Sequence, residues 1–451
     1  MKSKIIFFLT LCLCFSVVNT FGQKKVKPNK DIKNMLKKVS AKQLEKYNRK
    51  LVSFGTRNTN SAQDDPKRGI GAARDWIYDE FKRISADCDG CLEVEKQTYL
   101  QKKQRRIPKD INITNVIATL KGTKNPDRIY VVSGHYDSMC GDPSDGECDA
   151  PGANDDGSGT VAVIEMARVM SKMKFDATIM FMTVAGEEQG LLGANHFVKE
   201  AVKKKLDIEA MLTNDIIGGA KKFKDRADRN SVRVFAEGVP SNETEQQARL
   251  RRSVGGENDS ATRQLGRYIH EAALMYSPKF GVQLIYRRDR YLRGGDHIPF
   301  LENGYAAVRV TEPHEDYDRQ HQNVRTENGK DYGDLPDFVD FKYIANVTKI
   351  NIATLASLAN APAKPKSVGI DITRLTNDTD LKWQANTEDD LAGYEIVWRS
   401  TTSPYWTNSK FVGNVTKYTM PDMSKDNFFF GVRAVDKDGF KSPVVFPRPT
   451  R

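Results

Sequence analysis

The chain has 451 residues, of which 39% are hydrophobic and 29% are charged, and its formal net charge is +11. This length allows two or three domains whose cores need no disulfide or metal staples. The composition is that of a globular protein, and it excludes a chain disordered throughout, a collagen and a polytopic membrane protein. The lysine runs are short and no nucleic-acid motif is present, so we interpret the basic balance as solvated surface charge and expect no nucleic-acid partner.

The first 22 residues are predicted to be a signal peptide. Lys2 and Lys4 precede an apolar run from Ile5 to Val18, and a cleavage site is predicted after Gly22. An apolar run of about 14 residues is too short to span a bilayer comfortably, so we expect no stable membrane span. The sequence therefore predicts an exported protein, whether secreted, periplasmic or held at the cell surface.

Four cysteines lie beyond this leader: Cys88, Cys91, Cys140 and Cys148. An even number of cysteines in an exported chain predicts two disulfides, for which three pairings are possible. We favour the two local pairs, Cys88 with Cys91 and Cys140 with Cys148. A zinc knuckle or a redox-active pair at Cys88 and Cys91 is the alternative, and it is less favoured in an exported chain.

Residues 23–361 alternate between strand-like and helix-like patterns. After a basic, polar lead-in over residues 24–42, helical spacing is predicted at 69–85, 159–170, 191–205 and 338–358. Apolar runs typical of strands are predicted at 115–120, 129–133, 178–184, a short run ending at 215, 232–236, 282–286 and 306–310. Residues 240–262 are polar and charged, so we expect a surface excursion there. Strands that alternate with helices indicate an α/β fold, with a mostly parallel mixed sheet and helices on both faces.

The pattern changes at residues 361–366, a linker of alanine, proline and lysine. Beyond it, residues 367–451 lose the helical spacing and alternate as strands do, with turn signals between the runs. About 85 residues of this kind suit a small all-β sandwich. We therefore expect a signal peptide over residues 1–22, an α/β domain over 23–361 and a β-sandwich domain over 367–451.

Acidic residues and histidines stand where the predicted strands end. His135 and Asp137 follow the run 129–133, Glu187 and Glu188 follow the run 178–184, and Asp215 ends the next strand. The carboxyl ends of parallel strands meet at one edge of a sheet, where ligands collect. Two adjacent carboxylates there repel each other unless a positive group lies between them. Taken one at a time, these segments have simpler interpretations, such as an acidic turn exposed to solvent.

Two further segments can join this edge. The loop over residues 151–159 reads PGANDDGSG and places Asp155 at the start of a predicted helix. Carboxylates at a helix start are often only caps, but the glycines let this loop approach a ligand closely. His321 follows the run 306–310 and its loop. Imidazole and carboxylate donors suit zinc, and three carboxylates with one hydroxide would balance two divalent ions.

The order and spacing of these motifs resemble the M28 family of zinc peptidases, of the bacterial aminopeptidase type. The matching motifs are GHYDS at 134–138, GANDDGSG at 152–159, GEEQG at 186–190, ND at 214–215, GDH at 295–297, and His321, spread over residues 30–360. The resemblance implies two zinc ions bridged by Asp155. One ion would be completed by His135 and Asp215, and the other by Glu188 and His321.

The same resemblance implies roles for residues that bind no metal. Glu187 would be the general base, and Asp137 would orient the first histidine ligand. Asp156 would stand where the family often has a cis peptide after the bridging aspartate. The sequence departs from the family after His321, where glutamine, asparagine, valine and arginine follow. His314 is therefore a competitor for the last ligand.

Other acid–histidine patterns have simpler interpretations. Asp296 can cap the helix that follows it. His270 begins a His-Glu pair that lacks the second histidine of a thermolysin-like zinc helix. His196 is expected to pack or to face solvent.

Residues 367–451 resemble a fibronectin type III module. The resemblance rests on an early tryptophan, Trp383, and on the runs at 394–398 and 431–436. Such modules commonly space, dock or adhere, so no catalytic residue is expected in this region.

The sequence therefore predicts a secreted zinc exopeptidase that acts on peptides, and in particular an aminopeptidase. A carboxypeptidase is one alternative, because Arg287, Arg288, Arg290 and Arg293 could bind a substrate carboxylate. An exposed basic loop is the simpler interpretation of these four residues. A glutaminyl cyclase of the same fold and a non-catalytic surface-binding protein are the remaining alternatives. The pattern does not determine the oligomeric state.

Overall fold

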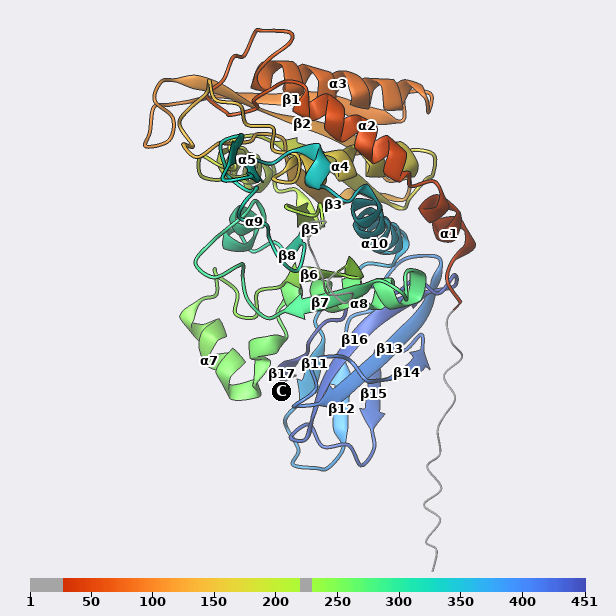
Figure 1. Cartoon of the computed structure of the whole chain (residues 1–451). Helices are drawn as coiled ribbons and strands as arrows, with labels where there is room; N and C mark the ends of the chain where they lie inside the picture. The colour runs from red at the N-terminus through yellow and green to blue at the C-terminus, as the bar shows by residue number, and fades with distance from the viewer. Residues whose placement is uncertain (1–26, 220–228) are drawn as a thin grey trace, which may run out of the picture.

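The computed structural model describes residues 27–219 and 229–451, so the predicted signal peptide lies outside the described residues. Its centre is an eight-stranded sheet in the order β1-β2-β4-β3-β5-β8-β6-β7 (Figure 1). The strands are β1 (Leu92–Gln101), β2 (Ile111–Leu120), β3 (Asn125–His135), β4 (Ala177–Val184), β5 (Asp207–Asn214), β6 (Ser231–Phe235), β7 (Gly281–Ile285) and β8 (Ala307–Thr311). Neighbours along β4-β3-β5-β8 run parallel, as do β6 and β7, and the other pairs are antiparallel. The predicted mixed, mostly parallel sheet is confirmed.

Helices cover both faces of this sheet, as predicted. They are α1 (Lys30–Lys37), α2 (Ala41–Val52), α3 (Ile70–Ala86), α4 (Gly157–Met170), α5 (Leu192–Lys204), α8 (Ala261–Tyr276), α9 (His297–Glu302) and α10 (Phe341–Asn360). A further helix, α7 (Glu245–Val254), buries no residue. Helices α4 and α10 are buried on nearly every side and contribute many residues to the main core. Helices α5 and α9 pack on the other face, where Phe197 meets Phe300.

Part of the basic lead-in folds as helix α1, whose charges obscure its apolar stripe in the sequence. Ile32, Met35 and Leu36 are buried, while Lys30, Lys33 and Lys37 face solvent. The side chain of Asn29 caps the helix by accepting two backbone N–H bonds. Three apolar positions in eight residues are too few for a periodicity argument, so tertiary packing decides this element.

Residues beyond α10 form two small sheets, ordered β15-β12-β11-β17 and β14-β13-β16. Their strands are β11 (Gly369–Asp371), β12 (Thr379–Lys382), β13 (Leu391–Ser400), β14 (Asn408–Gly413), β15 (Lys417–Met420), β16 (Phe428–Asp436) and β17 (Arg448–Thr450). Leu381 and Met420 of one sheet share a core with Tyr394 and Phe430 of the other. The predicted all-β sandwich is confirmed. Its likeness to a fibronectin type III module and the domain limits at 361 and 367 stay predictions.

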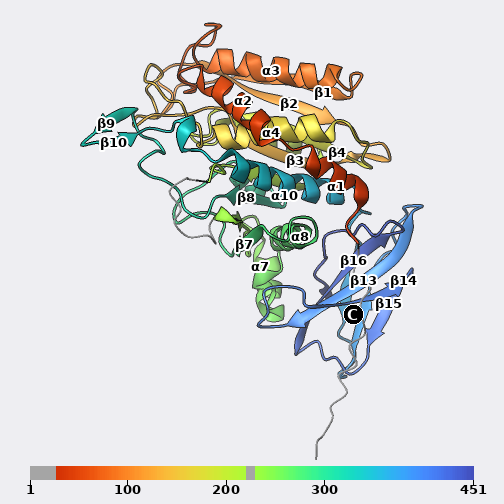
Figure 2. The ribbon, with the colours of Figure 1, turned by 45° about the vertical axis from the view of Figure 1, so that its right-hand side comes forward.

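The sandwich packs against the end of the α/β region that carries α7 and α8 (Figure 1, Figure 2). Asp259 lies buried between Arg267 of α8, at 2.9 Å, and Arg399 of β13, at 2.6 Å. The Trp406 indole donates to the amide oxygen of Gln264 at 2.9 Å. The expected surface excursion at 240–262 is therefore only partly correct, since α7 buries no residue but Asp259 is enclosed by two guanidinium groups.

The two disulfides join Cys88 to Cys91 and Cys140 to Cys148, which confirms the local pairing. Disulfides persist in oxidising compartments, in agreement with the predicted export. Across residues 27–219 and 229–451, none of the helices has both the length and the hydropathy that a membrane crossing needs.

Candidate active site

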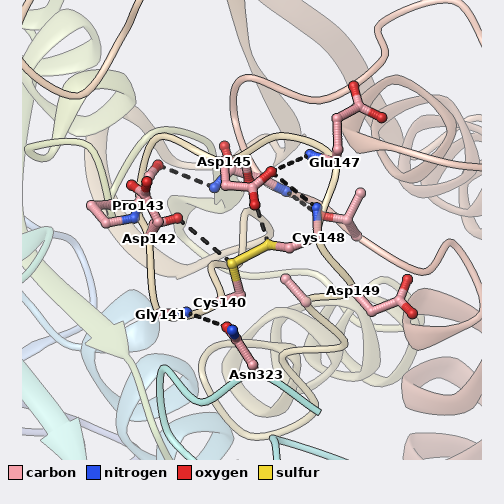
Figure 3. The surroundings of a disulfide bond; sticks show 12 residues. Cys140, Gly141, Asp142, Pro143, Asp145, Glu147, Cys148, Asp149 and Asn323 are labelled. Carbon is pink, nitrogen blue, oxygen red and sulfur yellow. Dashed lines mark hydrogen bonds between the residues drawn. A yellow bond between two sulfur atoms is a disulfide. The ribbon is translucent and has the colours of Figure 1, made fainter.

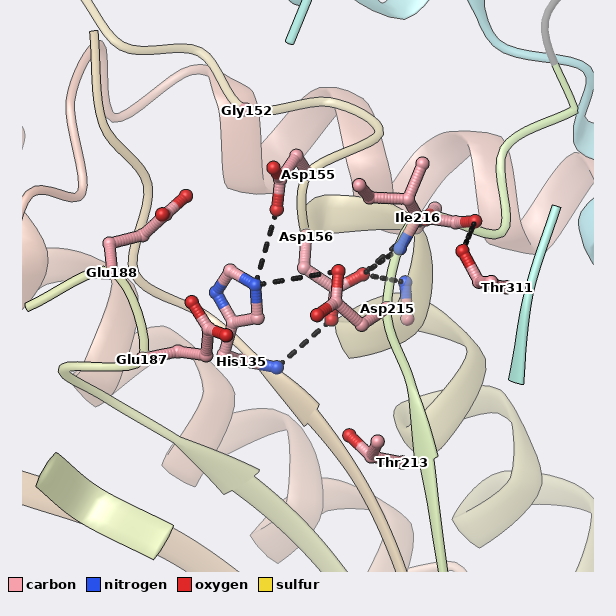
Figure 4. Close-up of polar contacts among 12 residues, drawn as sticks. His135, Gly152, Asp155, Asp156, Glu187, Glu188, Thr213, Asp215, Ile216 and Thr311 are labelled. Carbon is pink, nitrogen blue, oxygen red and sulfur yellow. Dashed lines mark hydrogen bonds and ion pairs between the residues drawn. The ribbon is translucent and has the colours of Figure 1, made fainter. Parts of the chain in front are cut away.

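Three parallel strands bring most of the predicted site residues to one edge of the sheet (Figure 4). The residues that follow these strands are His135 at the end of β3, Glu187 and Glu188 after β4, and Asp215 after β5. Two loops supply the others, Asp155 before α4 and His321 after β8. Because β3, β4 and β5 point the same way, their carboxyl ends, and the side chains that follow, meet at one place. The hairpin of β9 (Arg325–Glu327) and β10 (Lys330–Tyr332) follows the His321 loop.

His135, Asp155 and Asp215 form the first cluster. Nε2 of His135 lies 3.2 Å from Oδ1 of Asp155 and 3.8 Å from Oδ1 of Asp215, and all three residues are buried. Within the part of the chain that the structure describes, His135 Nε2 and Asp215 Oδ1 have no hydrogen-bond partner. Buried polar atoms are rarely left without partners. One imidazole nitrogen and two carboxylate oxygens, placed in this way, fit a zinc ion.

Asp155 also belongs to a second cluster, with Glu188 and His321. Nε2 of His321 lies 2.9 Å from Oδ2 of Asp155 and 3.0 Å from Oε1 of Glu188. The two clusters thus share one carboxylate, with one oxygen toward each histidine. His321 adopts a φ of 55°, a conformation that histidine accepts more readily than bulkier residues do. The competitor His314 is exposed and belongs to neither cluster.

Asp137 connects the first cluster to the two glutamates. Its carboxylate lies 3.5 Å from Nδ1 of His135, and the same ring nitrogen contacts its backbone oxygen at 3.2 Å. The carboxylate also accepts the backbone N–H groups of Glu187 and Glu188, at 3.3 and 3.1 Å. The sequence interpretation included only the contact with His135, because the contacts with the glutamates depend on the position of the loop after β4.

Asp156 begins α4 and joins it to β3. Its carboxylate accepts the backbone N–H groups of Gly159, at 2.9 Å, and of His135, at 3.0 Å. The capping interpretation therefore applies to Asp156, and the peptide bond between Asp155 and Asp156 is cis. A Cβ atom on Gly159 would lie 2.1 Å from the backbone oxygen of Asn214. The close approach of α4 to the end of β5 therefore requires glycine.

Two buried residues that the sequence interpretation missed support the ligand carboxylates. Nη1 of Arg309, in β8, lies 2.5 Å from Oδ2 of Asp215, which leaves Oδ1 facing His135. Burial would raise the pKa of Asp215, but Arg309 and His135 hold that pKa well below its ordinary value. Asp334 accepts the backbone N–H of Asp155 at 2.7 Å. The only feature of the sequence that could have indicated Arg309 is its charge within the apolar run 306–310. No feature of the sequence indicates Asp334.

Arg57, a third such residue, is fully buried and joins the loops on either side of the first cluster. Its guanidinium donates to the backbone oxygens of Tyr136, Pro151 and Gly152. Its own backbone N–H donates to the hydroxyl of Ser138, at 3.1 Å. Burial lowers the pKa of Arg57 to about 10, so the side chain stays charged at neutral pH. The segment after His135 and the segment before Asp155 are thereby held together.

Asp155, Asp215, Glu188 and His321 of the two clusters line a cavity of about 590 Å³, a size typical of small-ligand sites. Its walls also include Glu187, Tyr317, Arg106, Arg290 and Arg293. Of the four arginines in the predicted carboxylate-binding loop, only Arg290 and Arg293 line the cavity. Arg287 lies over the ring of Tyr291, and Arg288 pairs with Glu302. Arg106 comes from the β1–β2 loop, which no sequence signal connected with the site.

The disulfide loop over residues 140–148 contacts the two segments that carry Glu188 and His321, and Figure 3 shows its contact with Asn323. The side-chain oxygen of Asn323, two residues after the histidine ligand candidate, accepts the N–H of Gly141 at 2.9 Å. On the other side, Nε2 of Gln189 donates to the backbone oxygen of Pro143 at 2.9 Å. The loop therefore connects the segment that carries Glu188 with the segment that carries the histidine.

Crowding of buried charges changes the proton affinities in the site. Burial raises the pKa of Glu187 well above its ordinary value, with His135 opposing the rise and Glu188 adding to it. Burial would lower the pKa of His321, but Glu188 and Asp155 raise it to about 11. The carboxylates therefore favour a positive group at each histidine position, as a metal site requires.

The remaining acid–histidine patterns lie outside both clusters. Asp296 precedes α9, but its side chain makes no capping hydrogen bond, so the capping interpretation is wrong. Burial raises the pKa of Asp296 to about 7. His196 stacks on Tyr99 with ring centroids 4.0 Å apart, and His270 stacks on Tyr405 at 4.4 Å. Both histidines are thus packing residues.

Comparison with known proteins gives a family match and close relatives. The model described as Peptidase family M28 matches residues 115–337. A probable zinc metalloprotease of Leptosphaeria maculans is 48% identical over 94% of this chain and 98% of that protein. One from Pyrenophora teres f. teres is 47% identical over 94% of this chain and 88% of that protein. The LapA aminopeptidase of Legionella pneumophila has a similar fold, with a TM-score of 0.52 and 17% identity over 76% of this chain and 78% of that one.

Proposed function

The chain belongs to peptidase family M28, and on that premise we propose that it is a secreted, zinc-dependent aminopeptidase with two metal ions. Its relatives are named as probable zinc metalloproteases, which is the broader class of this proposal. The observation that carries the proposal is the pair of ligand clusters that share Asp155, with Glu187 beside them in the same cavity. A cavity of ligand size, about 590 Å³, supports an exopeptidase that takes a chain end. The motif resemblance to bacterial aminopeptidases supports the choice of the amino end.

In this proposal His135, Asp155 and Asp215 hold one ion, and Asp155, Glu188 and His321 hold the other. Imidazole nitrogens and carboxylate oxygens are the usual ligands of catalytic zinc. When bound, zinc supplies Lewis-acid chemistry, which stabilises negative charge that develops on oxygen.

Glu187 is the general base. Its backbone N–H is held by Asp137, and it lines the cavity beside both clusters. Its carboxylate takes a proton from the attacking water and delivers that proton to the leaving amine when the peptide bond breaks.

The test compares free and N-acetylated forms of the same peptides, with wild-type protein and the Glu187→Gln variant. We expect wild type to cleave only peptides with a free amine, and Glu187→Gln to be at least about 100-fold slower with unchanged zinc content. Glu93→Gln is the matched control, because Glu93 is an exposed residue of β1.

Three outcomes would contradict the proposal. Near-normal turnover by Glu187→Gln would show that Glu187 is not the general base. Equal cleavage of acetylated peptides would indicate a carboxypeptidase or an endopeptidase. Cleavage of neither form would favour a cyclase or a non-catalytic protein.

A further inference from the structure

Arg106 is presented to the cavity by a tight turn. Gln104 and Ile107 exchange two backbone hydrogen bonds, and Ile107 is fully buried, so the loop is anchored at that point. Nη1 of Arg106 donates to the backbone oxygen of Glu188 at 2.6 Å. Arg106 makes no ion pair within residues 27–219 and 229–451, and an arginine carries five N–H donors in a planar fork. Most of its donors thus remain for a ligand.

Arg293 adds charge to the cavity wall from a distant segment. Its Nη1 lies 2.8 Å from Oε2 of Glu315, and 34% of its side chain is exposed. Glu315 is shared, because Arg290 at 3.0 Å and Arg233 at 3.4 Å pair with the same buried carboxylate. Asp289 lies 3.1 Å from Arg290 and so balances the positive charge of that residue. Arg233 does not line the cavity, so the positive surplus of this wall is the charge of Arg106, together with the part of the Arg293 charge that the shared Glu315 leaves unneutralised.

The acidic residues of the cavity do not remove that surplus once metal is bound. Four carboxylates line the cavity, those of Asp155, Glu187, Glu188 and Asp215, and two divalent ions would balance them. The arginines of the wall then set the sign of the potential, and a cleft of one sign concentrates ligands of the opposite sign.

We propose that the site selects peptides with a carboxylate close to the scissile bond, and that Arg106 and Arg293 bind this carboxylate. The inference rests on the proposed function, since it names the substrate class of the same site. The carboxylate belongs either to the side chain of an acidic first residue or to the carboxyl end of a dipeptide. Guanidinium forks recognise both in the same way. Peptides that begin with lysine or arginine are disfavoured.

The test measures kcat/KM of the zinc-loaded protein for two matched pairs of substrates. Glu-Ala-Ala-amide and Gln-Ala-Ala-amide differ only in the charge of the first side chain. Ala-Ala and Ala-Ala-amide differ only in the charge of the carboxyl end. In one of the two pairs, we expect kcat/KM to be about tenfold or more higher for the substrate with the carboxylate. This ratio is the effect of one hydrogen bond to a charged group.

Arg106→Gln and Arg293→Gln should each reduce that preference about tenfold. Glutamine at position 106 can still donate to the Glu188 carbonyl, and the ratio within a pair cancels any general loss of activity. Arg105→Gln and Arg287→Gln are the matched controls, because these neighbouring arginines do not line the cavity. Both controls should keep the preference of wild type.

A binding measurement separates failure of the inference from failure of the proposed function. Calorimetry on Glu187→Gln should give tighter binding of the carboxylate member of the preferred pair, and Arg106→Gln added to it should remove the difference. Equal kcat/KM within both pairs, or a preference unchanged in both arginine variants, would overturn the inference while hydrolysis dependent on Glu187 stands. Absence of such hydrolysis would refute the proposed function, and the binding result would then decide the inference.

Discussion

Replacement of Gly159 with alanine should destabilise the protein, although alanine is the better helix former. Gly159 lies in the first turn of α4, and a Cβ atom there would lie 2.1 Å from the backbone oxygen of Asn214. The carboxylate oxygens of Asp156 would lie 2.6 and 2.7 Å from the same atom. Either the start of α4 or the end of β5 must move, and a proposed zinc ligand lies next to each, Asp155 before α4 and Asp215 after β5.

The two opposing contributions can be compared. Alanine in place of glycine within a helix gains about 0.5–1 kcal/mol. Overpacking costs about 1–3 kcal/mol and more where backbone must move. The clash at Gly159 involves a backbone atom more than 1 Å inside the 3.4 Å of an ordinary contact, so we expect the upper end of that range. The net loss should be about 2 kcal/mol.

Urea denaturation of Gly159→Ala measures this loss, and Gly266→Ala in α8 is the matched control. A Cβ on Gly266 would meet only side-chain atoms, at 3.2 and 3.3 Å, so that variant should stay within about 1 kcal/mol of wild type. Gly159→Ala should also bind zinc about tenfold more weakly, because the groups that orient the ligands shift. A Gly159→Ala protein as stable as wild type, with unchanged zinc affinity, would refute the reasoning.

Three further predictions concern the last ligand, the disulfide loop and acid stability. His321→Ala should reduce bound zinc from two ions to one per chain, whereas His314→Ala should keep both; metal analysis after dialysis distinguishes them. A double variant, Cys140→Ser with Cys148→Ser, should lose about tenfold in kcat/KM, because the loop connects the two segments of the second cluster; unchanged kinetics would contradict that role. Burial would raise the pKa of Glu395, but a neighbouring arginine and lysine hold it at about 2. The stability from Glu395 is therefore present above pH 4.5 and lost as pH falls toward 2, by about 3 kcal/mol, and Glu395→Gln should flatten this part of the unfolding curve against pH.

Much of the fold and of the site followed from local patterns. The runs 129–133 and 178–184 lie within β3 and β4, because apolar strands bounded by turn residues are a local signal. His135, Glu187, Glu188 and Asp215 each follow such a strand, so their convergence required only that the strands run parallel. Asp155 needed the family motif as well, since a carboxylate at a helix start is as often a cap, the role that Asp156 has here.

The sequence by itself determined the fold class, the sandwich at the carboxyl end, the local disulfides and the set of candidate ligands. The tertiary structure alone decided between His321 and His314 as the second histidine beside Asp155, and it alone brought Arg106, Arg309 and Asp334 to the site. Arg106 is 82 residues from the Glu188 carbonyl that it contacts. Periodicity and turn signals act over a few residues, whereas such contacts depend on sheet order and on the paths of loops between strands. Those are set by packing of the whole core, which no local window of sequence contains.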